Sequence, residues 1–133
     1  MGETTKKKGE RITEEAVIQI HDYLIEETGG NPGIRDPGTL YFLVEAINRE
    51  SDIFRKAAQA LLLADRHPFW DGQKRTAFEL ADSILRTEGH CFDRSDKAET
   101  MRVMIKIAEY KCPEGEEIDT IVRWVKRKVL KLE

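Results

Sequence analysis

One short segment of the sequence gathers side chains that can do chemistry. Residues 67–75 read HPFWDGQKR and hold a histidine, a carboxylate, a glycine, an amide and two cations within nine positions. His67 can take a proton from a hydroxyl near neutral pH. Asp71 offers the oxygen ligands that Mg²⁺ prefers and that it usually shares with phosphates. The segment therefore predicts phosphate chemistry at a hydroxyl.

The same segment leads into a predicted helix that begins near residues 72–74. A helix N-terminus presents free backbone N–H groups and the positive end of the helix dipole, so it is a ready anion site. Gly72 lets the backbone approach an anion closely. Lys74 and Arg75 add full positive charges, and an arginine can grip phosphate oxygens in a bidentate way. We expect Phe69 to anchor this loop in the core.

Each of these residues also has an interpretation without chemistry. A histidine before proline commonly ends a helix at the surface, Asp71 can cap the helix that follows, and Lys74 and Arg75 can be ordinary surface cations. The combination of residue types at fixed offsets favours the catalytic interpretation of His67. Trp70 has two equal interpretations, as an aromatic that faces a nucleotide or as a cover for the core.

Hydrophobic spacing predicts that helices position this segment. The third predicted helix is rich in alanine, is expected to be central, and stops at His67-Pro68. No strand of convincing alternation is present. The predicted helices begin at Thr13, at Asp36-Pro37, at Ser51 or Asp52, near Gly72, at Asp96, and after a break at Cys112–Gly115, the last one running through Leu132.

A few other residues are interpreted as structural. Met101 and Met104 stand at helical spacing and are expected in the core, as is Cys91. His21 has no partner pattern in the sequence, so we also assign it a structural role.

Residues 29–38 form a loop with four glycines and two prolines. The loop is longer than a plain link between two helices usually is. We expect Ile34 and Arg35 at its tip, and at most a small hairpin within it.

Composition excludes several classes of protein. Hydrophobic residues make up 40% and charged residues 35% of the chain, which is typical of a globular domain. The net charge of −3 argues against general nucleic-acid binding. No apolar run approaches the roughly 18 residues of a membrane helix, and no signal peptide is visible.

The domain organisation that we predict is a flexible basic tail over residues 1–11 and one domain over residues 12–133. Cys91 and Cys112 are too few and too far apart for a metal site or a disulfide framework. They read as two reduced thiols, which favours a cytoplasmic protein.

The segment HPFWDGQKRTA, residues 67–77, resembles the signature of the Fic/Doc superfamily, H-x-F-x-[D/E]-G-N-[G/K]-R. Lys74 and the Thr76-Ala77 pair are similar to the Doc (death-on-curing) toxin branch, as are His21-Asp22 and the 29–38 loop. The resemblance covers about residues 12–93. It implies a single all-α Fic/Doc-type domain of about six helices, in which the glycine-rich loop is a short flap.

The resemblance implies transfer of a phosphate-containing group from a nucleotide to a protein hydroxyl. Doc toxins transfer the γ-phosphate of ATP to a threonine of translation elongation factor Tu, which arrests translation. In these enzymes the position matching His67 is the base and the position matching Asp71 binds Mg²⁺. The nucleotide phosphates are surrounded by the positions matching Gly72, Gln73, Lys74 and Arg75. The flap holds the target segment, and the flap residues that match are Gly33, Ile34 and Arg35.

Two departures from the family pattern keep alternatives open. Gln73 replaces the family asparagine, and because its side chain is longer, Gln73→Asn is expected to raise activity. Phe78 stands where relatives that transfer AMP carry a second arginine, which favours phosphate transfer. The alternatives are AMP transfer to a protein hydroxyl, or a weakly active Fic fold kept as a regulatory binding module.

An antitoxin is the expected partner. The autoinhibitory motif [S/T]-x-x-x-E-[G/N] is not found upstream of His67, and toxins of this type are restrained by a separate protein. We expect an antitoxin helix to lie in an apolar groove formed by the first helix and the 29–38 loop, with Ile34 as the best single contact.

Overall fold

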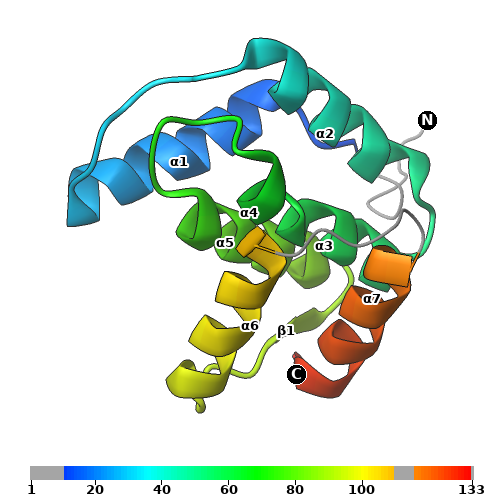
Figure 1. Cartoon of the computed structure of the whole chain (residues 1–133). Coiled ribbons are helices and arrows are strands. Elements are labelled where there is room, and N and C mark those ends of the chain that lie inside the picture. Colours follow the sequence, from blue (N-terminus) through cyan, green and yellow to red (C-terminus); the bar gives the residue numbers. More distant parts are fainter. Residues whose placement is uncertain (1–10, 110–115, 133) are drawn as a thin grey trace.

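The computed structural model describes residues 11–109 and 116–132, and these residues confirm the all-α domain. Figure 1 shows the helices gathered around α5, with the short strand β1 between α6 and α7 in this view. The elements are α1 (Glu14–Thr28), α2 (Pro37–Arg49), α3 (Ile53–Leu61), α4 (Leu63–Arg66), α5 (Gln73–Arg86), β1 (His90–Phe92), α6 (Lys97–Glu109), α7 (Glu116–Lys128) and β2 (Val129–Lys131).

The predicted helix starts are confirmed by their caps. Thr13, Asp36 and Asp52 each accept a hydrogen bond from the backbone N–H three residues on, at 3.1, 3.1 and 2.9 Å. Asp96 accepts one from Glu99 N in the same way, at 3.0 Å. These caps satisfy backbone donors that a helix leaves free, so four helix starts follow from local chemistry.

The core lies where α3 crosses α5. Small side chains on both helices are fully buried, among them Ala57, Ala60, Ala77 and Ala81. They let the two backbones approach closely. Helix α3 also contacts α2 and α7, which confirms its predicted central position. Cys91 is buried as expected.

The third predicted helix is two helices in the structure. At Leu62 the backbone N–H is shared between Ala58 O, at 3.3 Å, and Gln59 O, at 3.1 Å. This tightening of the turn separates α3 from α4. It lets the chain change direction one turn before His67.

Two strands were missed by the sequence analysis. The last predicted helix ends at Lys128, and β2 pairs antiparallel with β1, with Cys91 opposite Leu130. The expectation of helix through Leu132 is therefore wrong. Strands of three residues are too short to show alternation, so only the pairing partner reveals them.

Some predictions fall at the margins of the described chain. Residues 1–10 and the break at Cys112–Gly115 lie outside the described residues. Arg11, the last residue of the predicted tail, is described and lies 3.7 Å from a carboxylate oxygen of Glu45. Among the helices of the described residues, none has the length and apolar character to cross a membrane.

A buried carboxylate ties the end of α5 to β1. Asp82 accepts hydrogen bonds from Phe92 N and Arg86 Nε, both at 2.8 Å, and from Arg94 Nη2 at 3.1 Å. Burial raises the pKa of Asp82, but the hydrogen bonds from Arg86, Phe92 and Arg94 outweigh it and hold that pKa below its usual value. The ionised form is therefore the one that stabilises the fold.

We expect Asp82→Asn to lower the free energy of unfolding by about 2 kcal/mol at pH 7. Because the folded pKa of Asp82 is depressed, its contribution is fully present above the ordinary carboxyl pKa and is lost as the pH falls through the folded value. Urea unfolding of both proteins at pH 7 and at pH 3 measures this. A difference of the same size at both pH values would show that ionisation of Asp82 is not the cause.

Candidate active site

The loop between α4 and α5 is anchored from inside. Phe69 is 1% exposed, as expected of an anchor, and its ring stacks on that of His21 with centroids 3.8 Å apart. The amide of Gln73 holds the Phe69 backbone from the other side, because Gln73 Nε2 donates to Phe69 O and Gln73 Oε1 accepts from Phe69 N. The loop backbone is thus held on both sides.

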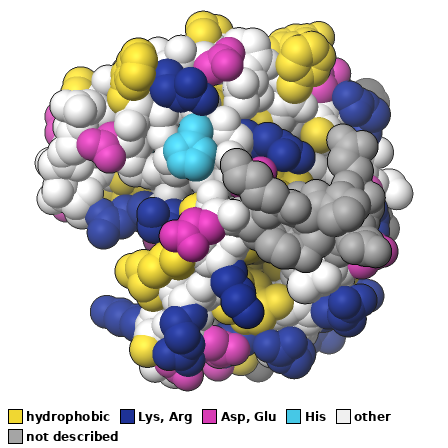
Figure 2. Space-filling model, viewed as in Figure 1, with side chains coloured by type: hydrophobic (Ala, Val, Ile, Leu, Met, Phe, Trp, Pro, Cys, Tyr) yellow, Lys and Arg dark blue, Asp and Glu magenta, His cyan; other side chains and the backbone are white. Residues whose placement is uncertain are grey.

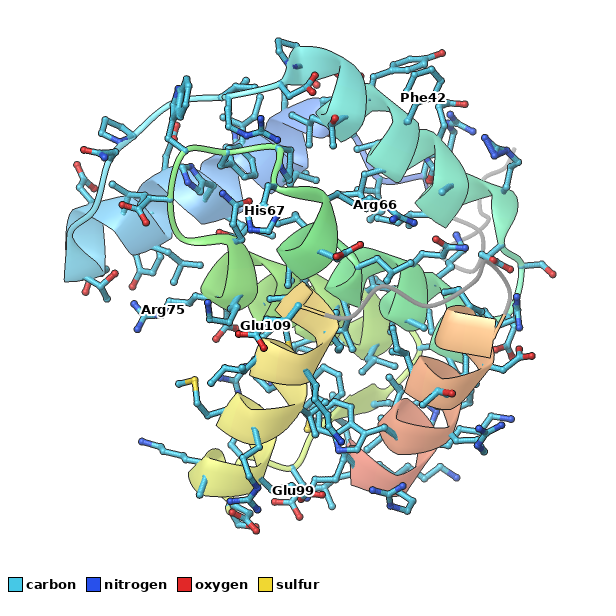
Figure 3. The ribbon with its side chains drawn as sticks, in the orientation of Figure 1. Phe42, Arg66, His67, Arg75, Glu99 and Glu109 are labelled. Carbon is cyan, nitrogen blue, oxygen red and sulfur yellow. The ribbon has the colours of Figure 1, made fainter. Side chains whose placement is uncertain are left out.

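His67 ends α4 in the left-handed region, with φ 59° and ψ 54°. This conformation costs a non-glycine residue about 1–3 kcal/mol and is found most often at functional sites. The imidazole is exposed, and Nδ1 lies 2.9 Å from Asp65 O. A carbonyl oxygen accepts, so Nδ1 carries the hydrogen and Nε2 keeps a lone pair. Figure 3 shows His67 on the same face of the molecule as Arg66.

The glycine-rich loop lies against this segment. Ile34 forms a bridge with Phe69, Arg35 N donates to Pro68 O at 2.8 Å, and Trp70 N donates to Gly33 O at 3.3 Å. The side chain of Arg35 donates to His67 O at 2.8 Å. The small hairpin that the sequence allowed at most within residues 29–38 does not form, since the loop takes its pairing partner from residues 67–70.

The N-terminus of α5 is open to an anion. Its N-cap is Gly72, with φ 75°, and no side chain of the described residues caps it. The first bond within the helix runs from Thr76 N to Gly72 O, which leaves the N–H groups of residues 73–75 without a helix partner. Asp71 therefore does not cap α5, which removes the structural alternative to its interpretation as a metal ligand. Its Oδ2 accepts from Asn31 N at 3.1 Å instead.

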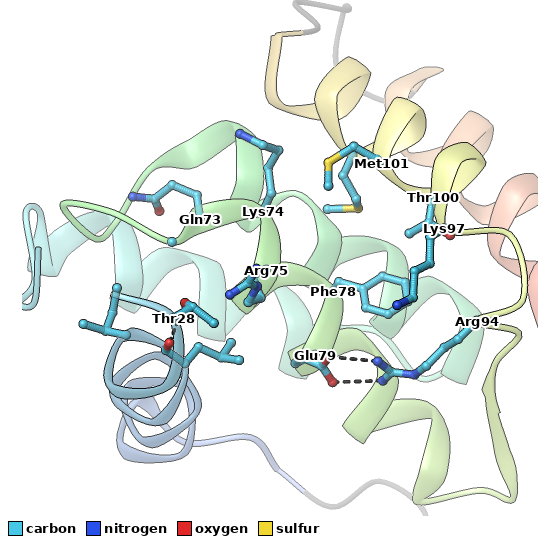
Figure 4. A pocket seen from close by; sticks show the side chains of 14 residues that line it. Thr28, Gln73, Lys74, Arg75, Phe78, Glu79, Arg94, Lys97, Thr100 and Met101 are labelled. Atoms are coloured by element: carbon cyan, nitrogen blue, oxygen red, sulfur yellow. Dashed lines mark hydrogen bonds and ion pairs between the residues drawn. The ribbon is translucent and has the colours of Figure 1, made fainter. Parts of the chain in front are cut away.

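A pocket of about 430 Å³ opens beside this N-terminus, between α1, α5 and α6. Figure 2 shows this side of the molecule hollowed, with cationic and hydrophobic side chains at the edge. Figure 4 shows the cations that line it together with apolar side chains. The cations are Lys74, Arg75, Arg94 and Lys97, and the apolar residues are Leu24, Ile25, Phe78, Met101 and Met104. Such walls fit a molecule with a flat apolar part and an anionic part.

The structure brings part of the predicted site together. Gly72, Gln73, Lys74 and Arg75 line the pocket, whereas His67 and Asp71 lie in the loop that leads to it. Trp70 is 60% exposed and does not line the pocket. Its indole lies against the flap, because a Cβ added to Gly33 would be 3.6 Å from Trp70 Cδ1. Trp70 therefore covers the flap.

The remaining pocket residues were missed or misplaced. Met101 was expected in the core but is 56% exposed, because it borders the pocket. Met104 was also expected in the core and is buried, as predicted. Arg94 and Lys97 carry no local signal in the sequence, since only the path of the chain after β1 brings them to the pocket.

Comparisons with known proteins agree with this geometry. A model of the Fic/DOC family matches residues 11–85. The chain belongs to the Fic/DOC family. It is also 33% identical over 96 residues to "Protein kinase doc" of Escherichia phage P1, a match that covers 66% of this chain and 76% of that protein. The resemblance to the Doc branch is thereby confirmed.

The Fic/DOC match covers the part of the chain that forms the loop, the flap and the N-terminus of α5. It ends at Leu85, so α6 lies beyond it. Helix α6 supplies Met101 and Met104 to the pocket, and the loop before it supplies Arg94. One wall of the pocket is therefore not part of the matched Fic/DOC region.

Gln73 is where this chain departs from the Fic/DOC signature, and the structure changes what we expect of it. Its side chain is buried and its amide holds the Phe69 backbone. An anion at the N-terminus of α5 would meet the Gln73 backbone N–H, not its side chain.

We now expect Gln73→Asn to lower activity, contrary to the expectation from the sequence alone. The shorter amide cannot reach the Phe69 backbone in the same way, and losing these hydrogen bonds costs about 1–2 kcal/mol of stability. Thermal unfolding and the transfer rate of both proteins measure this. If Gln73→Asn transfers faster at unchanged stability, the side chain of residue 73 binds the anion, as expected from the sequence, and glutamine binds it less well than asparagine.

Proposed function

We propose that this Fic/DOC protein is a Doc-like toxin that transfers the γ-phosphate of ATP to a hydroxyl of a protein, in a Mg²⁺-dependent reaction. One observation carries the proposal: within the described residues, a single loop presents His67 with Nε2 unpaired and then leads into a helix N-terminus that no side chain caps. A base and an anion site in one short loop are what phosphoryl transfer to a hydroxyl requires.

His67 Nε2 accepts the proton of the target hydroxyl. The hydroxyl oxygen forms the new bond to the γ-phosphorus as the bond to the oxygen bridging the β- and γ-phosphates breaks, and ADP leaves. The backbone N–H groups of residues 73–75, with the charges of Lys74 and Arg75, stabilise the negative charge on the phosphates in the transition state.

The residues around Asp71 fit a Mg²⁺ ion that arrives with the nucleotide. The side chain is exposed, and within the described residues only Oδ2 has a hydrogen-bond partner, Asn31 N. No group of three or more His, Cys, Asp or Glu side chains is present in the described part of the chain. Mg²⁺ commonly uses one or two carboxylates plus substrate phosphates. When bound, it would neutralise phosphate charge, with Asp71 as its protein ligand.

The flap lies beside the proposed base, which supports a role in holding the target. Gly33 and Arg35 are hydrogen-bonded to the 67–70 segment, and Arg35 contacts the backbone of His67 itself. By resemblance to Doc toxins, we propose that Gly33, Ile34 and Arg35 hold a segment of a translation elongation factor.

An antitoxin is the partner that the resemblance to Doc toxins implies. Ile34, the antitoxin contact expected from the sequence, is half-buried against Phe69 and does not line the pocket, which makes the pocket the larger apolar surface for such a helix. We propose instead that the antitoxin helix covers the pocket, where Leu24 and Ile25 of α1 face Met101 of α6.

The geometry near Phe78 favours phosphate over AMP transfer. Phe78 occupies the position of the second arginine of AMP-transferring relatives, and the guanidinium of Arg94 lies 5.0 Å from its ring centroid. Arg94 does not replace the missing arginine in this arrangement, because its charge is already paired with Glu79 at 2.9 and 3.0 Å and with Asp82 at 3.1 Å.

Labelled ATP tests the proposal. The protein is incubated with a cell extract containing translation factors and with ATP labelled at either the γ- or the α-phosphate. Protein labelled only from the γ position is the expected result. Label from the α position would establish AMP transfer, and no label from either would favour a regulatory binding module.

A further inference from the structure

We propose that His21 of α1 is a positioning residue for the transfer reaction: by holding the peptide between Asp71 and Gly72, it orients both the Asp71 carboxylate and the N-terminus of α5. The inference rests on the proposed function, since it assigns a role within that site. It concerns a residue that the sequence analysis treated as merely structural.

The contact is direct. His21 is 0% exposed, and its Nε2 lies 2.8 Å from Asp71 O. The carbonyl oxygen accepts, so Nε2 carries the hydrogen. The same ring stacks on Phe69 with an interplanar angle of 6°. One side chain of α1 therefore holds the loop at two points, one on each side of Trp70.

The Asp71–Gly72 peptide needs such a restraint. Gly72 adopts φ 75°, and a glycine can leave this conformation at little steric cost. A Cβ on Gly72 would lie 3.3 Å from Ile25 Cδ1 and 3.7 Å from His21 Nε2, so α1 lies directly against the peptide. Fixing the Asp71 carbonyl fixes the orientation of this peptide. It thereby fixes the direction in which α5 begins.

Packing alone does not explain a histidine here. A phenylalanine would stack on Phe69 equally well without burying a polar atom. His21 Nδ1 is buried and, among the described residues, has no hydrogen-bond partner. The nearest acid, Asp22 Oδ1, is 3.7 Å away, too far for a hydrogen bond. Burying an unsatisfied polar atom destabilises the fold, so the hydrogen bond from Nε2 is what the residue contributes.

The test compares four variants in the full chain. His21→Phe keeps the stacking and removes the donor. His21→Gln places an amide N–H at about the reach of Nε2, and His21→Asn only at about the reach of Nδ1. His90→Phe is the matched control, because His90 also has a buried Nδ1 without a partner but lies in β1, against Phe54.

We expect His21→Phe and His21→Asn to lower kcat and to weaken the calorimetric affinity for ATP in the presence of Mg²⁺, by about 10- to 100-fold. Affinity for ATP without Mg²⁺ should fall by less, because only the N-terminus of α5, and not the Asp71 carboxylate, acts on the phosphates when the metal is absent. His21→Gln should recover most of both losses, and His90→Phe should match the parent protein. If His21→Phe fails to fold, the inference is tested by comparing kcat and Mg²⁺-dependent ATP affinity between His21→Gln and His21→Asn.

Parental kcat and Mg²⁺-dependent ATP affinity in a folded His21→Phe or His21→Asn would overturn the inference. Equal losses in Gln and Asn would overturn it too, since they would point to packing. If the parent protein itself transfers nothing, the proposed function fails, and the calorimetric affinities still decide whether His21 orients Asp71.

Discussion

Replacing His67 with alanine is expected to lower the transfer rate by about 10²- to 10⁴-fold, the usual cost of removing a general base. The loss should fall on kcat, because the imidazole does not line the pocket at the N-terminus of α5, where we propose that the phosphates of ATP bind. The fold should survive, because the side chain is exposed and its hydrogen bond within the described residues is to the nearby Asp65 O. Single-turnover transfer from γ-labelled ATP measures the change.

The control for His67→Ala is its affinity for ATP with Mg²⁺, which should equal that of the parent protein, together with an unchanged melting temperature. A folded variant that transfers at the parental rate would mean that another group takes the proton and that His67 only ends α4. Growth offers a second measurement. Expression of the parent chain alone should slow cells, and His67→Ala should relieve the effect.

Replacing Asp71 with alanine is expected to reduce ATP affinity in the presence of Mg²⁺ to that measured without Mg²⁺. The loss is on the order of 100-fold, since a metal ligand supplies several kcal/mol of charge stabilisation. Calorimetric titrations of ATP with and without Mg²⁺ measure it directly, without relying on activity.

Asp71→Asn separates the charge from the flap contact. Asp71 Oδ2 also accepts from Asn31 N, so Asp71→Ala loosens the flap as well. The asparagine keeps an oxygen acceptor for Asn31 N but removes the negative charge. Both variants should lose the effect of Mg²⁺. If the parent protein binds ATP equally well with and without Mg²⁺, Asp71 is not a metal ligand and its role is only to hold the flap.

The sequence by itself determined the helices and the chemistry-bearing segment, because both depend on neighbours in the chain. Caps such as Thr13 and Asp36 act within one turn, so they are visible without the fold. The spacing from His67 to Arg75 is likewise local, and the resemblance that it carries led to the Fic/DOC family.

What only the tertiary structure decided depends on contacts between distant residues. The flap pairs with residues 67–70 and not with itself, and β2 pairs with β1, because the fold brings together edges that are far apart in the chain. Met101 is exposed because α6 borders a pocket there. The amide of Gln73 faces Phe69 and His21 holds the Asp71 carbonyl. Backbone groups that packing shields from water need hydrogen-bond partners, and here the Gln73 and His21 side chains supply them.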